Sequence, residues 1–144
     1  MERQFQRMIK VFLDTSFAIA LSAVTDQNHR KAVQIANQIE ADGTRLVTTQ
    51  AILLEIGNAL SKQRYRDSAI QLLESLEADT NVEIVVLTKA LYRAAFDLFR
   101  NRPDKEWGLV DCCSFVVMQT QGITDALTAD EHFSQAGFRA LLRS

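Results

Sequence analysis

The chain has 144 residues, of which 47% are hydrophobic and 24% charged, with 5 glycines and 1 proline. This is the composition of an ordinary globular protein, and it excludes a disordered, fibrous or low-complexity chain. The net charge of −2 excludes a strongly basic nucleic-acid-binding protein, so any contact with nucleic acid must depend on local basic groups or on metal ions. We expect one domain over residues 1–144.

The two cysteines and the first residues bear on where the protein acts. Cys112 and Cys113 are adjacent, which suits neither a structural disulfide nor a zinc site. No apolar run approaches the length of a membrane span, and residues 1–10 are too polar for a signal peptide. We therefore expect a soluble protein of the reducing cytoplasm.

In chain order, the residues predict short strands separated by helices. Residues 10–14 are an apolar run that ends in an acid, as in a buried strand, and Asp14 with the hydroxyl residues after it can begin a helix. The predicted elements are a strand at 10–14, a helix at 14–24, a helix capped by Asp26 or Asn28 and ended by Gly43, a strand at 44–48, helices at 51–62 and 66–78, a strand at 82–87, helices at 88–99 and 111–121, and strands at 123–128 and 138–142.

This alternation predicts the fold class. Parallel strands need a crossover connection, and a helix supplies it, so the expected class is α/β with a central parallel sheet of four to five strands. Binding sites in such sheets lie beyond the carboxyl ends of the strands. Asp14 and Asp130 each close or just follow an apolar strand, so both should project at the same edge.

Four carboxylates stand where such a sheet can gather them: Asp14, Glu55, Asp111 and Asp130. Three of them also have a simpler interpretation, because Asp14, Asp111 and Asp130 can each cap a helix or a turn, which is worth about 1 kcal/mol. Glu55 lies in the apolar stretch Leu53–Gly57, where burying an unpaired charge is costly. It needs a partner such as a basic side chain or a metal ion.

The four acids together favour metal-dependent chemistry. Converging carboxylates repel one another and raise each other's pKa, and a divalent cation removes that conflict. Oxygen ligands select Mg²⁺ or Mn²⁺ over zinc. Water on such an ion can attack a phosphodiester while a second ion stabilises the leaving oxygen, so the set indicates a nuclease.

Five segments, in chain order, match the motifs of a known family. They are Val11–Ser16 (VFLDTS), Leu54–Ala59 (LEIGNA), Asp104–Cys112 (DKEWGLVDC), Ala126–Phe133 (ALTADEHF) and Gln135–Phe138 (QAGF). The first four resemble the ordered motifs of PIN-domain ribonucleases, and the last is typical of toxins of the VapC type. The resemblance covers the chain from Lys10 onward.

The resemblance implies a three-layer α/β/α fold and Mg²⁺- or Mn²⁺-dependent cleavage of RNA that inhibits translation. It also implies neutralisation by a cognate antitoxin and a homodimer. Carried over residue by residue, the catalytic and metal-binding set is Asp14, Glu55, Asp111 and Asp130, and the supporting residues are Ser16, Thr128 and Asp104.

Several other residues have both a functional and a structural interpretation. Arg100, Arg102 and Lys105 precede Asp111 and can hold RNA phosphates, or they can be ordinary surface charges. Trp107 can stack on a base, but core packing or a partner contact is favoured. For His132 we expect a local hydrogen bond near Asp130 rather than a catalytic role.

The early helices carry more apolar residues than one core-facing stripe needs: Phe17, Ile19, Leu21, Val24, Ile35 and Ile39. Such a surplus suits either an apolar groove that accepts an amphipathic antitoxin helix or ordinary packing in a small domain.

The sequence leaves other functions to consider. A receiver domain would need an acceptor aspartate after a central strand, but the 82–87 segment is followed by Thr88. A haloacid-type phosphatase would need an aspartate where Ser16 stands. A PIN nuclease that processes RNA without being a toxin, and a non-catalytic α/β binding module, both remain open.

Overall fold

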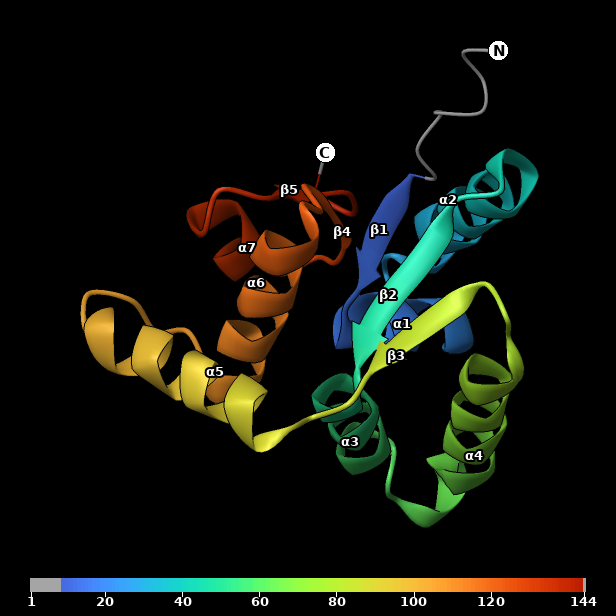
Figure 1. Ribbon diagram of the computed structural model, residues 1–144. Coiled ribbons are helices and arrows are strands. Elements are labelled where there is room, and N and C mark those ends of the chain that lie inside the picture. Colours follow the sequence, from blue (N-terminus) through green and yellow to red (C-terminus); the bar gives the residue numbers. More distant parts are fainter. Residues whose placement is uncertain (1–8, 144) are drawn as a thin grey trace, which may run out of the picture.

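The computed structural model describes residues 9–143, which form a five-stranded sheet and its covering helices (Figure 1). In chain order the elements are β1 (Lys10–Leu13), α1 (Thr15–Ser22), α2 (His29–Asp42), β2 (Arg45–Thr49), α3 (Gln50–Ala59), α4 (Gln63–Ala78), β3 (Val82–Val85), α5 (Lys89–Asn101), α6 (Leu109–Gln121), β4 (Asp125–Leu127), α7 (Glu131–Gln135) and β5 (Arg139–Ala140).

All neighbouring strands pair in parallel, in the order β3-β2-β1-β4-β5. The predicted α/β class with four to five parallel strands is confirmed. From β1 the chain steps to β2 and β3 on one side, then returns to β4 and β5 on the other. The order therefore reverses between β1 and β4, which is where α/β sheets place their ligand crevice.

The helices form two layers because the chain moves along the sheet in one direction from β1 to β3 and in the opposite direction from β3 to β4. Right-handed crossovers put the helices between β1 and β3 on one face and those between β3 and β4 on the other. The packing agrees: α1 contacts α2, α3 and α4, whereas α5 and α7 contact α6. In Figure 1, α5, α6 and α7 lie to the left of β1, β2 and β3, and α2 and α4 lie to the right of β1 and β2.

Several predicted element ends lie up to three residues from the observed ones, and three elements near the predicted acids show why. The helix expected at 111–121 begins at Leu109, with Gly108 as its N-cap residue, so Asp111 lies inside the first turn. The strands expected at 123–128 and 138–142 are observed only over β4 and β5. Ile123 follows Gly122, which ends α6 with a left-handed backbone conformation, and β5 pairs with β4 over only two residues. Apolar periodicity predicts that an element exists, but hydrogen bonding decides where it ends.

An aromatic cluster holds α6 and α7 against β1. The ring of Phe133 lies 6.3 Å from that of Phe12 and 5.0 Å, edge to face, from that of Phe115, and all three side chains are buried. Trp107 packs edge to face on Phe115 at 5.0 Å. These contacts fix the start of α6 and the short α7, both of which carry predicted site residues.

The described part of the chain contains no helix that is both long and apolar enough to cross a membrane. Cys112 and Cys113 are both buried free thiols. Burial raises the pKa of the Cys112 thiol to about 11, which keeps it protonated and unreactive at neutral pH.

Candidate metal-binding active site

Strand register brings Asp14 and Thr128 together at the switch point. Leu13 of β1 is paired with Leu127 of β4, so the next residue on each strand leaves the sheet at the same place. The Asp14 N–H donates to the Leu127 carbonyl at 3.2 Å. The Thr128 hydroxyl then donates to Oδ2 of Asp14 at 2.7 Å. The two side chains meet because parallel strands in register end together.

Ser16 completes this hydroxyl support. Its hydroxyl donates to Asp14 Oδ2 at 3.2 Å, lies 3.1 Å from the Thr128 hydroxyl, and accepts the N–H of Ala129 at 3.0 Å. Asp14 occupies the N-cap position of α1, but its side chain makes no capping hydrogen bond. The simpler cap interpretation therefore does not account for this carboxylate.

Asp14 is buried, with 5% of its surface exposed, and its charge is disfavoured. The pKa of Asp14 is raised from 3.8 to about 6. Burial is the largest cause and the charges of Glu55 and Asp111 act in the same direction, whereas hydrogen bonds from Thr128 and the Thr15 backbone act against them. No basic side chain is among the causes of the shift. A buried carboxylate beside two other acids is a position that a cation would stabilise.

Glu55 reaches the same place from α3. Thr49, the last residue of β2, caps α3 by accepting the N–H of Ile52 at 3.1 Å, and Glu55 follows on the second turn. The Thr15 hydroxyl donates to Glu55 Oε1. Glu55 is half-buried, as its apolar neighbours predicted. Its partner in the structure is a hydroxyl rather than a basic side chain.

Asp111 faces the site from the first turn of α6. Its Oδ2 accepts the N–H of Gly108 at 3.1 Å, so part of its role is the helix-start contact that the sequence allowed for. The same oxygen lies 3.0 Å from Nδ1 of His132. The N-terminal end of a helix favours negative charge, so a carboxylate suits this position.

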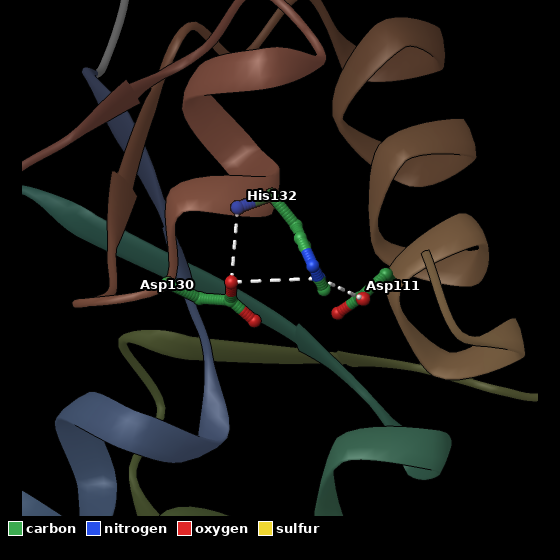
Figure 2. Close-up of side chains that lie close together, drawn as sticks. All are labelled: Asp111, Asp130 and His132. Atoms are coloured by element: carbon green, nitrogen blue, oxygen red, sulfur yellow. Dashed lines mark hydrogen bonds and ion pairs between the residues drawn. The ribbon is translucent and has the colours of Figure 1, made fainter. Parts of the chain in front are cut away.

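Asp130 caps α7, and it is joined to both sides of the site. Its Oδ1 accepts the His132 N–H at 2.9 Å, and its own N–H donates to the Thr128 hydroxyl at 3.0 Å. His132 Nδ1 also lies 3.5 Å from Asp130 Oδ1. Figure 2 shows the His132 ring reaching from α7 toward Asp111 on α6.

His132 is a member of the site whose position the sequence analysis only partly predicted. A local contact with Asp130 was expected and is confirmed, but the contact with Asp111 was not foreseen. The signal available in the sequence was a histidine two residues after an acid that follows a strand. Burial by itself lowers the pKa of His132, but the hydrogen bond to Asp111 and the charges of Asp130 and Asp111 together raise it.

The four predicted acids are thus brought to one edge of the sheet. Asp14 feels the charges of Glu55 and Asp111, and Thr128 bridges Asp14 to the backbone of Asp130. Ligand atoms of Asp111, Asp130 and His132 lie within 4.8 Å of one another, a spacing at which they could hold one ion. The four carboxylates also supply oxygen ligands, which suit a hard divalent cation.

The remaining predicted residues lie at the margin of this set. Asp104 is paired with Arg102 at 3.0 Å, and the Arg102 guanidinium holds the pKa of Asp104 below its usual range. Arg100 is paired with Asp97 at 2.8 Å on the exposed surface of α5. Asp104 and Lys105 line a polar surface hollow of about 440 Å³ that also includes His132. The loop therefore meets the site on the outer side of that histidine.

Trp107 is a core residue. It is 5% exposed, donates through Nε1 to Gln135 at 3.1 Å, and carries the Arg102 guanidinium 4.9 Å from its ring centre. The packing interpretation is confirmed, and the ring face is already covered, which argues against base stacking.

An apolar hollow of about 440 Å³ between α1, α2, α4 and the sheet is lined by none of the four acids. Phe17, Leu21 and Ile39 line it, as do Leu72 and Leu76 of α4. Three of the surplus apolar residues of the early helices therefore face one hollow, whereas Val24 is exposed elsewhere on the surface.

Comparison with known proteins identifies the family. The family model of the PIN domain matches residues 11–139, a span that includes every acid described above. The chain belongs to the PIN-domain family. The resemblance seen in the motifs is confirmed, and the five-stranded parallel sheet with its helices is the PIN fold.

Individual PIN proteins are similar over nearly their whole length. The chain is 30% identical over 128 residues to the 23S rRNA-specific endonuclease VapC20 of Mycobacterium tuberculosis, in strains H37Rv and CDC 1551, covering 89% of this chain and 95% of that protein. The crystal structure of M. tuberculosis VapC20, described as a Sarcin-Ricin loop cleaving toxin, matches with a TM-score of 0.78 and 28% identity over the same shares of the two chains.

A more distant match shows how far the fold extends. The crystal structure of VapBC2 from Rickettsia felis, bound to a DNA fragment from its promoter, matches with a TM-score of 0.66 at 12% identity, covering 92% of this chain and 97% of that one. At this identity the likeness concerns the PIN fold alone.

Proposed function

We propose that the protein is a divalent-metal-dependent endoribonuclease and the toxin of a toxin–antitoxin pair. The observation that carries the proposal is the connected set of carboxylates at the switch point, in which Thr128 and His132 join Asp14, Asp130 and Asp111. The similarity to VapC20, a 23S rRNA-specific endonuclease, supports RNA as the substrate.

The residues present fit a divalent cation. Asp14 is buried beside other acids, and the pKa raised to about 6 reflects a charge without a cationic partner. We propose Asp14, Glu55, Asp111 and Asp130 as the ligands, and Mg²⁺ or Mn²⁺ as the ion, because oxygen ligands suit both. When bound, such an ion supplies positive charge to the phosphate and lowers the pKa of a coordinated water.

The chain's own residues prepare this site. Thr128 and Ser16 hold one oxygen of Asp14 in a fixed orientation, and Thr15 does the same for Glu55. Such supporting contacts keep ligands in place before an ion arrives, and their loss typically weakens metal affinity or activity about 10–100-fold. Ser16 and Thr128 therefore act as supporting residues in this proposal.

Arg100, Arg102 and Lys105 are proposed phosphate contacts. Arg100 and Arg102 now pair with Asp97 and Asp104, but exposed ion pairs are worth only about 0–1 kcal/mol, so a phosphate can replace the partner. Lys105 and Asp104 lie on the loop that borders His132, which would place an RNA backbone beside the acids.

We further propose that the apolar hollow between α1, α2 and α4 receives an amphipathic helix of the cognate antitoxin. Phe17, Leu21 and Ile39 would bury the apolar face of that helix, as in other helix-in-groove complexes. A homodimer and a cytoplasmic location complete the proposal, on the strength of the resemblance to VapC-type toxins.

The test is cleavage by the purified protein. We expect it to cut 23S rRNA, or an oligonucleotide with the Sarcin-Ricin loop sequence, when Mg²⁺ or Mn²⁺ is present, and to stop when EDTA is added. Asp14→Asn should lower the rate by more than about 100-fold, since it removes a ligand charge. Asp67→Asn, which changes an exposed carboxylate on α4 outside the site, is the matched control.

Two results would contradict the proposal. One is cleavage that persists in EDTA, and the other is an Asp14→Asn protein as active as wild type. Absence of cleavage on several RNAs, with the metal bound, would instead favour the non-catalytic binding module. Cleavage of other RNAs without any effect on translation would favour an RNA-processing PIN nuclease over a toxin.

A further inference from the structure

His132 lies between two carboxylates that come from different helices. Its Nδ1 is 3.0 Å from Oδ2 of Asp111 on α6 and 3.5 Å from Oδ1 of Asp130 at the start of α7 (Figure 2). The two acids belong to different segments of the chain, and their carboxylates carry the same charge. The imidazole is the group that the structure places between them.

The contacts fall on one oxygen of each carboxylate. On Asp111, both the Gly108 N–H and the His132 ring engage Oδ2. On Asp130, both the His132 N–H and the ring engage Oδ1. Within residues 9–143 no other hydrogen bond to these two carboxylates is found, and in Figure 2 their second oxygens point into the same space. The imidazole therefore acts together with one backbone N–H on each carboxylate to set its orientation.

The ring itself is held in place by its neighbour. Phe133 is fully buried between Phe12 and Phe115, so the backbone of α7 is anchored directly beside His132. The His132 N–H is fixed as well, because it donates to the cap residue Asp130. An anchored backbone at this point makes the imidazole a rigid support rather than a mobile surface group.

We propose that His132 is a positioning residue that holds Asp111 and Asp130 in the orientation that binds the metal ion. The inference rests on the proposed metal-dependent nuclease function and goes beyond it by adding a fifth residue to the set of four acids. Without the imidazole, each carboxylate keeps only its backbone hydrogen bond, and an ion then has to gather the two acids against their mutual repulsion.

The test compares two substitutions at this position. His132→Leu removes the ring nitrogens but keeps an apolar side chain of similar reach, whereas His132→Asn keeps an N–H donor close to the place of Nδ1. The other histidine provides the control: His29 bonds through Nδ1 to the Ala20 carbonyl, outside the acidic set, and is changed to His29→Asn. Mn²⁺ affinity is measured by calorimetry without RNA, and RNA cleavage is measured separately.

We expect His132→Leu to weaken Mn²⁺ binding and to lower kcat about 10–100-fold, with KM for RNA little changed. His132→Asn should recover most of both losses, and His29→Asn should match wild type. Thermal unfolding in EDTA verifies that each variant is folded, and His132→Ala replaces the leucine variant if that protein is not.

The outcomes separate this inference from the function on which it rests. A leucine variant that binds Mn²⁺ as tightly as wild type overturns the positioning role. So does an asparagine variant as impaired as the leucine one, because the hydrogen bonds would then not be the cause. A wild-type protein that neither binds Mn²⁺ nor cleaves RNA overturns the proposed function, and this inference with it.

Discussion

Asp14→Asn should stabilise the metal-free protein at neutral pH, although it destroys the proposed site. The carboxylate is 5% exposed, and burial raises its pKa from 3.8 to about 6. Between these two values the folded chain binds more protons than the unfolded chain, so stability falls as the pH rises through that range. Above it, the ionised group costs about 3 kcal/mol, from about 1.4 kcal/mol for each pKa unit.

Asparagine has no charge to bury, so it removes this cost. It keeps an amide oxygen in the place where Asp14 accepts hydrogen bonds from Thr128 and Ser16. The gain in free energy of unfolding should be about 1.5 kcal/mol at pH 5 and about 3 kcal/mol at pH 7.5, because part of the Asp14 population is already protonated at the lower pH.

The assay is urea unfolding with EDTA present, at both pH values, with Asp67→Asn as the surface control. The control should change the free energy of unfolding by no more than about 0.5 kcal/mol. Saturating Mn²⁺ should reverse the order, since an ion that binds the folded wild type stabilises it and binds the variant weakly. A variant less stable than wild type at pH 7.5 in EDTA would refute the reasoning, because the Asp14 charge would then be stabilised by the fold.

Four further changes test other parts of the structure. Thr128→Val removes the hydroxyl that lowers the pKa of Asp14, so the acidic limb of the pH–cleavage profile should move to higher pH; an unmoved limb would show that Asp14 does not control it. Trp107→Phe keeps an aromatic ring but loses the Nε1 bond, so urea unfolding should show a loss of about 1–2 kcal/mol while cleavage stays unchanged; a large loss of cleavage in a folded variant would contradict a purely structural role for Trp107. Thr49→Ala deletes the cap of α3 and should cost about 1 kcal/mol in the same assay. Joint replacement of Arg100 and Arg102 by Ala should raise KM for RNA without changing kcat, and should weaken the salt dependence of binding; an unchanged KM would assign both residues to surface charge.

Much of the architecture could be predicted from local patterns. Apolar runs with a turn residue at each end identified the strands, and their alternation with helices predicted a parallel sheet. The edge at which Asp14 and Asp130 project followed from the same rule. Element ends were less predictable: Asp111 lies two residues inside α6 because Gly108 provides the cap.

For the site, the sequence by itself determined which acids stand at strand and helix ends, since chain order and side-chain type are local properties. Tertiary structure decided how they are joined. The register of Leu13 with Leu127 brings the Thr128 hydroxyl to Asp14, and the packing of α7 on α6 brings His132 to Asp111. Such contacts depend on distances between segments far apart in the chain, and no local pattern of residues encodes those distances.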